Sequence, residues 1–377
     1  MKRNPTLLFF LLALLFSCTA GGRAPGGGAA AQQEAVTMAA GRPGAIPVSI
    51  AVGETVSGPG KMIDAIYQDR DFNYWFATNG EGVYRYDGKT TLHITEKDGL
   101  CSDFVWSVQE DANGVLWFGS RDGICSFDGM KFTDHIDRVR KAPYGTLNYT
   151  PGGLFFNHPG GVCFYDGKTF TNFTLHPETY VPPANSMERP YDVYSTLADR
   201  SGKIWFGTQE MGVCVYDGKR FSYIGGKDLD GPAVRSVFQD RDGTMWFGNN
   251  GGGLYRYDGQ QLRNITEEKN LGNAEFLRGR KPVDKPGSLA RVFAISQDRE
   301  GNLWIGTADA GVWRYDGTGL TNYTTREGLS GNSVTVIYKD RKGDLFFVSN
   351  GDAVLRFNGS TFSKVAFQAH PFPDRVR

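Results

Sequence analysis

The sequence has few of the residues from which metal centres are built, and it has no excess of charge of either sign. Only five of its 377 residues are histidine, and none stands at a metal-ligand spacing from another. The 41 basic residues balance 41 acidic ones, so nucleic acid is not an expected partner. No serine, cysteine or histidine lies in a nucleophile motif. We therefore expect a protein that is not an enzyme and has no metal and no cofactor.

Long segments with a helical period are also missing. The single long apolar run, LLFFLLALLF at 7–16, is too short to span a bilayer as a mature helix. Two basic residues precede it, and it runs into LFSC at 15–18, which resembles a bacterial lipobox with Cys18 as the acylated residue. Residues 1–18 are therefore predicted to be a lipoprotein-type signal peptide. Cleavage after Ala20 by an ordinary signal peptidase is the alternative.

What the sequence has in abundance is one repeated phrase. DRDGTMWFGNNGGGLYRYDG begins at Asp240, and near copies begin at Asp111, Asp199 and Asp298. The Asp-Gly pair that ends the phrase recurs at intervals of 41, 38, 51, 41, 58 and 42 residues. These pairs begin at Asp87, Asp128, Asp166, Asp217, Asp258, Asp316 and, as Asn-Gly, Asn358. Seven copies of one unit are therefore predicted, with the third and seventh degraded.

Each unit reads as four short strands separated by turns. In the sixth unit the strands are RVFAISQD, LWIGT, GVWRYDG and LTNYT, rich in β-branched and aromatic residues. Their bulk on both faces fits sheets that are covered on both sides. In D-x-D-G and YDG, an Asp that bonds its own backbone and a Gly with positive φ predict tight turns. The sequence thus predicts an all-β fold, a seven-bladed β-propeller of four-stranded antiparallel blades.

The units resemble the two-component regulator propeller repeat, whose pattern is similar to V..I.QD.DG.LWFGT..GGL.RYDG..F..Y. Residues 240–259 and 298–317 match it closely, and EGLSGNSVTVIYKD at 327–340 resembles the family's link between units. The resemblance covers roughly residues 61–367. It implies an extracytoplasmic sensor propeller of the kind that usually belongs to membrane-spanning histidine kinases, several of which respond to oligosaccharides. We expect no kinase or other output domain in this chain.

The domain organisation follows from these features. Residues 46–367 are predicted to form the propeller, with repeats from about 61 and a further strand within 46–56 at its closure. Residues 19–45, rich in Gly, Ala and Pro, would be a flexible tether, and 368–377 a C-terminal tail. Because two or more acyl chains give stable attachment, the protein is expected to be exported and lipid-anchored, at a bacterial outer membrane.

The remaining cysteines are expected to be free thiols. Cys125, Cys163 and Cys214 occupy one third-strand position in successive units. Equivalent positions in neighbouring blades lie about 10 Å apart, beyond disulfide reach. Cys101 falls in a connecting loop and is not assigned.

Alternate turns of a propeller lie on opposite faces, here called rims. The turn rim carries D-x-D-G and YDG. The variable rim carries the turns between second and third strands, the links between blades and the insertions at 174–192 and 266–290. Binding usually sits on such variable, inserted loops. The candidate ligand-binding residues on this rim are Asn79, Arg121, His158, Gln209, Glu210, Asn250, Asp309, Asn350 and Tyr180.

Three functions remain open at this point. Arginine and asparagine beside aromatic residues such as Trp106 suit a glycan or another small polar ligand, which favours a membrane-anchored sensing propeller. Alternatively, the disc is a scaffold for a partner protein, and each candidate is an ordinary solvated turn residue. The second alternative is an enzyme like the streptogramin lyases, seven-bladed propellers that use His, Glu and Mg²⁺. There His158 and Glu210, on matching loops of neighbouring blades, would be the catalytic residues.

Overall fold

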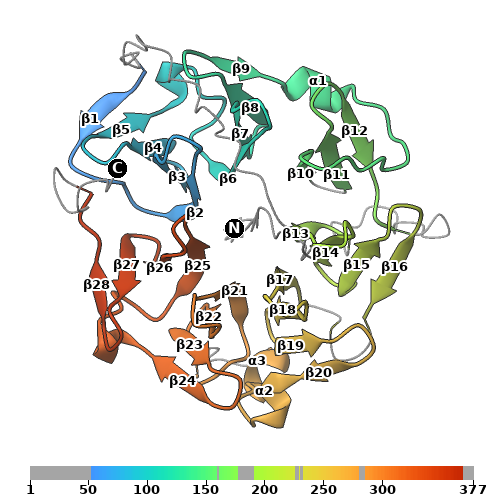
Figure 1. The fold of residues 1–377 in the computed structure, drawn as a ribbon, viewed down its shortest axis with the longest axis vertical. Helices are drawn as coiled ribbons and strands as arrows, with labels where there is room; N and C mark the ends of the chain where they lie inside the picture. The colour runs from blue at the N-terminus through green and yellow to red at the C-terminus, as the bar shows by residue number, and fades with distance from the viewer. Residues whose placement is uncertain are drawn as a thin grey trace, which may run out of the picture.

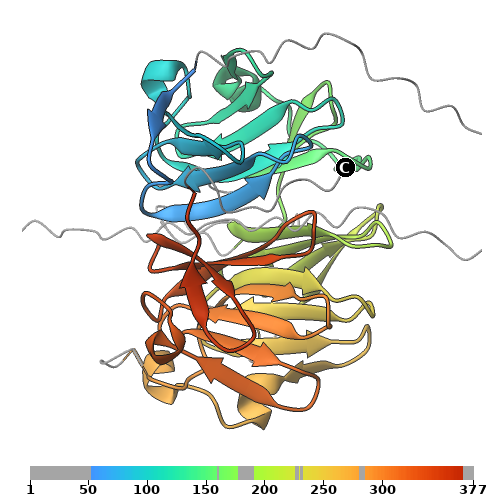
Figure 2. The ribbon, with the colours of Figure 1, turned by 60° about the vertical axis from the view of Figure 1, so that its left-hand side comes forward.

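The computed structural model shows seven antiparallel sheets arranged around a central axis (Figure 1), and the predicted seven-bladed β-propeller is confirmed. An oblique view shows the sheets of neighbouring blades packed face to face (Figure 2). The residues that the structure describes are 52–158, 161–176, 191–225, 229, 232–279 and 285–367. The predicted signal peptide, tether and C-terminal tail lie outside them.

Six blades run from the axis outwards in the order first, second, third and fourth strand. The first strands are β2 (Ile63–Gln68), β6 (Val105–Glu110), β13 (Val193–Ala198), β17 (Val234–Gln239), β21 (Val292–Gln297) and β25 (Val334–Lys339). The second strands are β3 (Tyr74–Thr78), β7 (Leu116–Ser120), β14 (Ile204–Thr208), β18 (Met245–Asn249), β22 (Leu303–Thr307) and β26 (Leu345–Ser349). The third strands are β4 (Val83–Tyr86), β8 (Ile124–Phe127), β15 (Val213–Tyr216), β19 (Gly253–Tyr257), β23 (Val312–Tyr315) and β27 (Ala353–Phe357). The fourth strands are β5 (Thr91–Ile94), β9 (Phe132–Asp134), β16 (Phe221–Ile224), β20 (Leu262–Asn264), β24 (Leu320–Tyr323) and β28 (Phe362–Lys364).

The third blade departs from the predicted four strands. Its described residues form three, which are β10 (Leu154–His158), β11 (Gly161–Tyr165) and β12 (Phe170–Phe173). Between β9 and β10 the chain instead forms α1 (Ile136–Arg140), which lies at the outer edge of the blade, where Asn172 of β12 donates to Val139 O at 2.9 Å. The irregular segment 141–153 follows, and its Pro and Gly residues do not favour a strand. The seventh blade, expected to be degraded, has all four strands. In the described part of the chain, no helix is long and apolar enough to cross a membrane.

The first and seventh blades close the ring through side chains and backbone bonds. Each has its own four strands, and β1 (Glu54–Val56) adds a fifth on the outer edge of the first blade, where it pairs with β5. A strand within 46–56 was expected, and its last three residues form it. At the junction, Ile63 N–H donates to Gly351 O at 2.8 Å, and the Tyr74 hydroxyl donates to Asp340 Oδ2 at 2.7 Å.

The blades bury both faces of their central strands, which explains why the sequence does not alternate between apolar and polar residues. All five residues of β14, of β18 and of β22 are buried. Each apolar cluster spans two neighbouring blades; for example, the rings of Trp75 and Phe118 lie 5.6 Å apart across the first junction. Packing between blades therefore supplies most of the core.

The cysteines behave as predicted within this core. Cys125, Cys163 and Cys214 are buried and free, and Cys101 is also a free thiol. The backbone N–H of Cys101 donates to Cys125 Sγ at 3.3 Å. Cys101, which the sequence left unassigned, therefore lies beside the third strand of the second blade.

The first aspartate of each D-x-D-G turn joins the turn to the blade. Asp240 Oδ1 accepts the backbone N–H groups of Asp242 and Thr244, and its Oδ2 accepts the indole N–H of Trp246 at 2.8 Å. Four other blades repeat this Asp–Trp bond six residues apart at 2.8–3.1 Å. The pairs are Asp69–Trp75, Asp111–Trp117, Asp199–Trp205 and Asp298–Trp304. The turn prediction is confirmed, but the indole bond was not foreseen.

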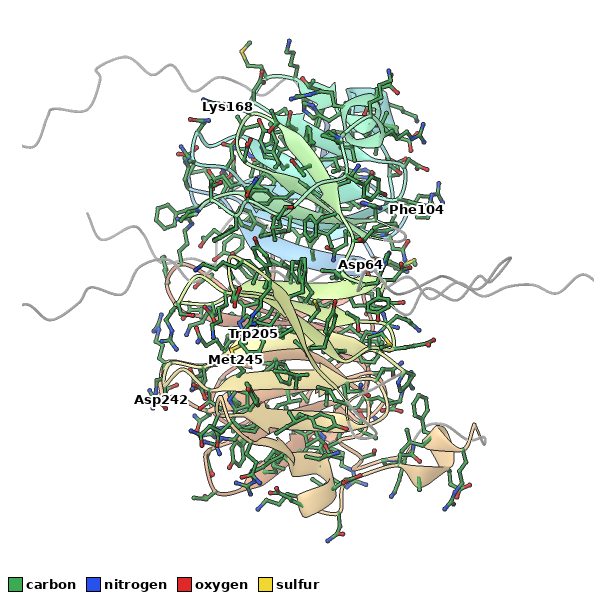
Figure 3. The ribbon with its side chains drawn as sticks, turned by 90° about the vertical axis from the view of Figure 1, so that its right-hand side faces the viewer. Asp64, Phe104, Lys168, Trp205, Asp242 and Met245 are labelled. Carbon is green, nitrogen blue, oxygen red and sulfur yellow. The ribbon has the colours of Figure 1, made fainter. Side chains whose placement is uncertain are left out.

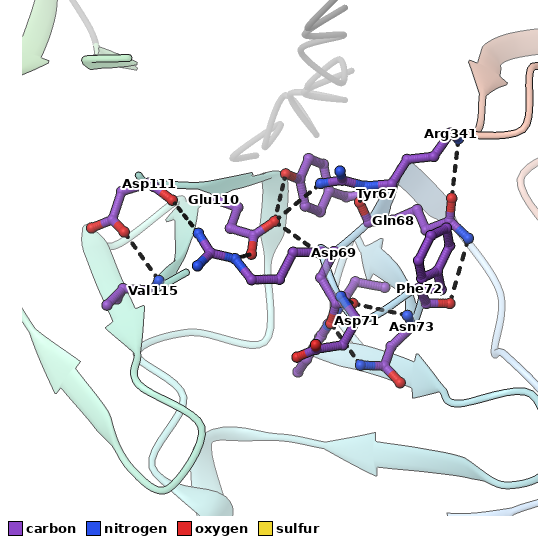
Figure 4. Close-up of polar contacts among 12 residues, drawn as sticks. Tyr67, Gln68, Asp69, Asp71, Phe72, Asn73, Glu110, Asp111, Val115 and Arg341 are labelled. Carbon is purple, nitrogen blue, oxygen red and sulfur yellow. Dashed lines mark hydrogen bonds and ion pairs between the residues drawn. The ribbon is translucent and has the colours of Figure 1, made fainter. Parts of the chain in front are cut away.

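The arginine after that aspartate joins the turn to the next blade. Its backbone N–H donates to a side-chain oxygen near the end of the neighbouring first strand, at 2.9–3.0 Å. The bonds run from Arg70 to Glu110, Arg200 to Gln239, Arg241 to Gln297 and Arg341 to Gln68. Figure 4 shows Glu110 and Gln68 receiving these bonds at the junctions of the first blade with the second and the seventh. Much of the polar surface of the turn rim thus holds blades together.

Asp240→Ala should lower the free energy of unfolding by about 3 kcal/mol, because it removes three hydrogen bonds to a charged acceptor and leaves a buried indole N–H unpaired. The matched control is Asp242→Ala two residues later, where the side chain is exposed and the alanine keeps the backbone donor. It should change stability by less than about 0.5 kcal/mol. Urea unfolding measures both, and equal losses would contradict the assignment.

Candidate functional site

The two predicted rims are opposite faces of the disc. Figure 3 shows Asp242 and Lys168, from a D-x-D-G turn and a YDG turn, at one face, and Phe104, from a link between blades, at the other. The turn rim and the variable rim are therefore arranged as the sequence predicted.

Five of the candidate residues occupy one equivalent position on the variable rim. The backbone N–H of each donates to the carbonyl of the residue just before the first strand of its blade. The bonds are Asn79 to Met62, Arg121 to Phe104, Gln209 to Asp192, Asn250 to Ala233 and Asn350 to Ser333, at 2.8–3.0 Å. These turns are thus joined to the chain that enters the innermost strands, and this part of the variable rim is here called its inner edge.

The other candidates lie near this position. His158 is the last residue of β10 and is half-buried, and Glu210 is exposed in the turn after β14. In the described residues, no group of three or more His, Cys, Asp or Glu side chains is arranged to hold a metal ion. Tyr180 and Cys18 lie outside the residues that the structure describes, so their predicted roles are not tested.

Two candidates are brought together by an arginine that the sequence analysis missed. Arg291 Nε donates to Asn250 Oδ1, and its Nη1 pairs with Asp309 Oδ2, both at 3.1 Å. The Asp309 side chain is only 5% exposed and that of Arg291 20%, so solvent screens this pair weakly. The ring of Phe276, in α3 (Ala274–Leu277), lies 4.9 Å from the guanidinium carbon. The 266–290 insertion therefore reaches the inner edge of the rim.

Arg121 stands apart from this cluster. Its guanidinium carbon lies 3.9 Å from the centre of the Phe104 ring, and its side chain is 50% exposed. Its ion pair with the neighbouring Asp122 is 3.4 Å long and exposed, so it holds the side chain only loosely. The Arg121 guanidinium remains accessible to a ligand.

A second set of side chains lies at the axis, just inside the variable rim. In six blades the innermost strand contains a β-bulge at its second residue, where the pairing with the second strand skips one position. A bulge turns its extra residue out of the regular ladder. The six bulge residues, here called the bulge ring, are Asp64, Trp106, Tyr194, Arg235, Phe293 and Thr335. Of these, the sequence analysis named only Trp106, as a nearby aromatic residue.

Bulge residues of neighbouring blades are in contact. The guanidinium carbon of Arg235 lies 3.7 Å from the centre of the Tyr194 ring and 5.5 Å from that of Phe293. Burial lowers the pKa of Arg235, contacts with Tyr194 oppose that shift, and the positive charge of Arg291 adds to it. The fourth, fifth and sixth blades thus bring two arginines and two aromatic rings together near the axis.

The opposite arc of the bulge ring has polar atoms without partners. Asp64 Oδ2 and Trp106 Nε1 are buried and make no hydrogen bond with the described residues. Burial raises the pKa of Asp64 to about 7. Asp64, Trp106, Tyr194 and Thr335 are each only half-buried as whole residues, so solvent reaches this level of the axis.

A pocket of about 330 Å³ lies on the turn rim, between the sixth and seventh blades. Arg299 and Arg356 line it, and both pair with Asp344, at 3.0 and 2.7 Å. Both arginines and Asp344 are therefore committed to ion pairs of the frame, one between the two blades and one within the seventh. We regard this pocket as part of the frame and place the candidate ligand site at the variable rim and the bulge ring.

Three segments of the chain match the family model described as "Two component regulator propeller". They are residues 99–122, 228–251 and 286–309. Each covers a link, the first two strands and the following turn of one blade, so each contains a bulge residue and a D-x-D-G-type turn. The chain contains two-component regulator propeller repeats. The model matches the second, fifth and sixth blades. The remaining blades have a similar architecture but a sequence that departs further from the repeat pattern.

Solved structures share the fold of this propeller. The extracellular domain of the hybrid two component system BT4673 from B. thetaiotaomicron is 18% identical over 82% of this chain and 40% of that chain, with a TM-score of 0.57. Virginiamycin B lyase from Staphylococcus aureus is 15% identical over 80% of this chain and 96% of that chain, with a TM-score of 0.56. The chain thus spans less than half of the sensor domain, and identities this low show the fold alone. No curated protein matches the sequence.

Asp64→Asn should flatten the pH dependence of stability between about pH 4 and 7. In the unfolded chain this carboxyl ionises above about pH 4, whereas burial keeps it protonated in the folded protein up to about pH 7. The free energy of unfolding of the wild-type protein therefore falls as the pH rises through this range, and it is not regained above pH 7. The variant should therefore gain stability over wild type with rising pH, by at most about 4 kcal/mol. Urea unfolding at pH 4, 5.5, 7 and 8 tests this, and a constant difference would contradict it.

Proposed function

We propose that this regulator propeller is an extracytoplasmic binding or sensing module whose ligand, a glycan or another polar molecule, sits around the axis at the variable rim. The observation that carries the proposal is the contrast between the rims. On the turn rim, carboxylates and arginines hold turns and blades together. On the variable rim and at the bulge ring, Arg121 is accessible, and Asp64 Oδ2 and Trp106 Nε1 lack partners among the described residues. The extracellular sensor domain of similar fold supports the same reading.

The rim near the fifth and sixth blades has the chemistry that a sugar needs. Phe276 lies over Arg291, and Leu277 beside it is 60% exposed. Helix α3 rests on the turn at Gly251, where a Cβ would come within about 3.1 Å of Phe276 and Leu277 atoms. An aromatic face next to fixed polar groups can take the apolar face of a sugar ring and its hydroxyls together.

Phe276→Ala should weaken glycan binding roughly tenfold, since an aromatic contact of this kind contributes about 1.4 kcal/mol. A glycan-array screen of the protein selects the best-binding glycan, and calorimetry with that glycan compares the variants. Phe72→Ala removes a half-exposed ring from the turn rim and is the matched control, with unchanged affinity expected. Equal affinities of the Phe276 variant and wild type would place the site elsewhere.

We propose that the propeller is exported and held to the membrane by lipid on Cys18. Cys18→Ser should move the protein from the membrane fraction to the soluble fraction and abolish labelling with a fatty-acid probe. Cys101→Ser, a matched change of a free thiol within the propeller, should leave both unchanged. Retention of the Cys18 variant in the membrane fraction would exclude acylation as the anchor.

The enzyme alternative rests on the fold shared with virginiamycin B lyase. It requires turnover of a streptogramin B antibiotic in the presence of Mg²⁺, with loss of turnover in His158→Ala. That result would replace the sensing proposal. A partner protein retained on the variable rim, and released by the same Phe276→Ala change in the absence of any glycan, would instead favour the scaffold.

A further inference from the structure

Arg235 is a buried cation without a counter-ion. It is 8% exposed, and no carboxylate among the described residues pairs with it. Its Nε and Nη1 groups are shielded from solvent and have no hydrogen-bond acceptor in the described part of the chain. Buried charge without a counter-ion is strongly unfavourable, and the hydrogen bond with Tyr194 and the rings of Tyr194 and Phe293 offset only part of that cost. Nothing in the blade requires a positive charge here, since the other five bulge residues are aspartate, tryptophan, tyrosine, phenylalanine and threonine.

We propose that the bulge ring is a subsite for a carboxylate of the ligand, with Arg235 as its counter-ion. The inference rests on the proposed binding function and adds the chemical class of the ligand, an acidic sugar or comparable carboxylate. Arg235 donates N–H groups to the carboxylate, while Tyr194 and Phe293 hold the plane of the guanidinium.

The neighbouring charges favour one negative group at this place. Arg291 already pairs with Asp309, so Arg235 is the cation in this cluster that lacks an acid. One uncompensated positive charge matches one carboxylate. Asp64, on the same ring, is protonated in a large part of the molecules at neutral pH and in nearly all of them at mildly acidic pH, because burial raises its pKa to about 7. Its repulsion of an entering carboxylate is therefore reduced.

Access to the subsite comes from the variable rim. The bulges are at the second residue of each innermost strand, next to the turns that carry Asn79, Arg121 and Asn250. In Figure 3, Asp64 lies closer to the face of Phe104 than to that of Asp242. A ligand whose neutral part contacts the rim thus places its acid towards the bulge ring.

The test uses full-length protein labelled with ¹⁵N, and the indole signal of Trp106, assigned with Trp106→Phe, reports on the bulge ring. D-Glucuronate and its neutral counterpart D-glucose are the probes. Glucuronate should shift the signal saturably, with at least tenfold higher affinity than glucose. Arg235→Met should abolish that preference, whereas Arg220→Met, which removes an exposed arginine from the turn rim, should retain it.

A second measurement separates binding from a structural role. Because Arg235→Met replaces an unpaired buried charge with an apolar chain of similar length, its urea midpoint should equal or exceed that of wild type. A lowered midpoint would show that the arginine serves the fold and would overturn the proposal. Equal affinity for glucuronate and glucose, or no binding of glucuronate, would overturn it as well. If Arg235→Met still binds glycans on the array but has lost its preference for glucuronate, both proposals are supported. If it binds glycans and keeps that preference, the proposed function remains and the carboxylate subsite at Arg235 is overturned.

Discussion

The hydrogen bond between an aspartate and the indole six residues later is the constraint on which the rest of this structure depends. One carboxylate fixes its own turn through two backbone N–H groups and fixes the second strand through tryptophan. The turn then presents the next residue, an arginine in several blades, to the neighbouring first strand. Because these bonds lie on the turn rim, that rim is largely committed to the frame. The opposite rim is left free to vary in length and charge.

The two places where this bond is missing show how much the ring tolerates. The third blade has Phe155 in place of the tryptophan and no first strand among its described residues, and packing of aromatic side chains supports it instead. The seventh blade has Phe346, so its Asp340 accepts a hydroxyl from Tyr74 in the first blade. In other blades the equivalent carboxylate bonds a tryptophan of its own blade, whereas Asp340 bonds a tyrosine of the neighbouring blade and so helps to close the ring. Closure needs no exchanged strand as long as such bonds and the shared core of both blades are present.

Much of this architecture could be predicted because each blade is encoded by a short sequence pattern that recurs along the chain. Seven spaced Asp-Gly or Asn-Gly pairs determine the number of blades, and the repeated position of Cys125 and its equivalents predicts buried free thiols. The bulge ring could not be found in this way. Its residues share no chemistry and differ from blade to blade, and only the strand register reveals that Asp64 and Arg235 are equivalent. The Arg291 cluster was missed for a related reason, since its partners lie 41 and 18 residues away in sequence.

The contrast between a uniform frame and a non-uniform ring has a physical consequence. Six blades share the same backbone geometry at the bulge, so side chains of different chemistry can occupy this position without a change of the frame. In this chain the bulge residues are asymmetric around the axis. Arg235 lies between two aromatic rings on one arc, and on the other arc Asp64 and Trp106 have polar atoms without partners among the described residues. A symmetric ring would bind a ligand in several equivalent orientations. An asymmetric one favours a single orientation, because only one arc offers positive charge, and that is the property a sensing site requires.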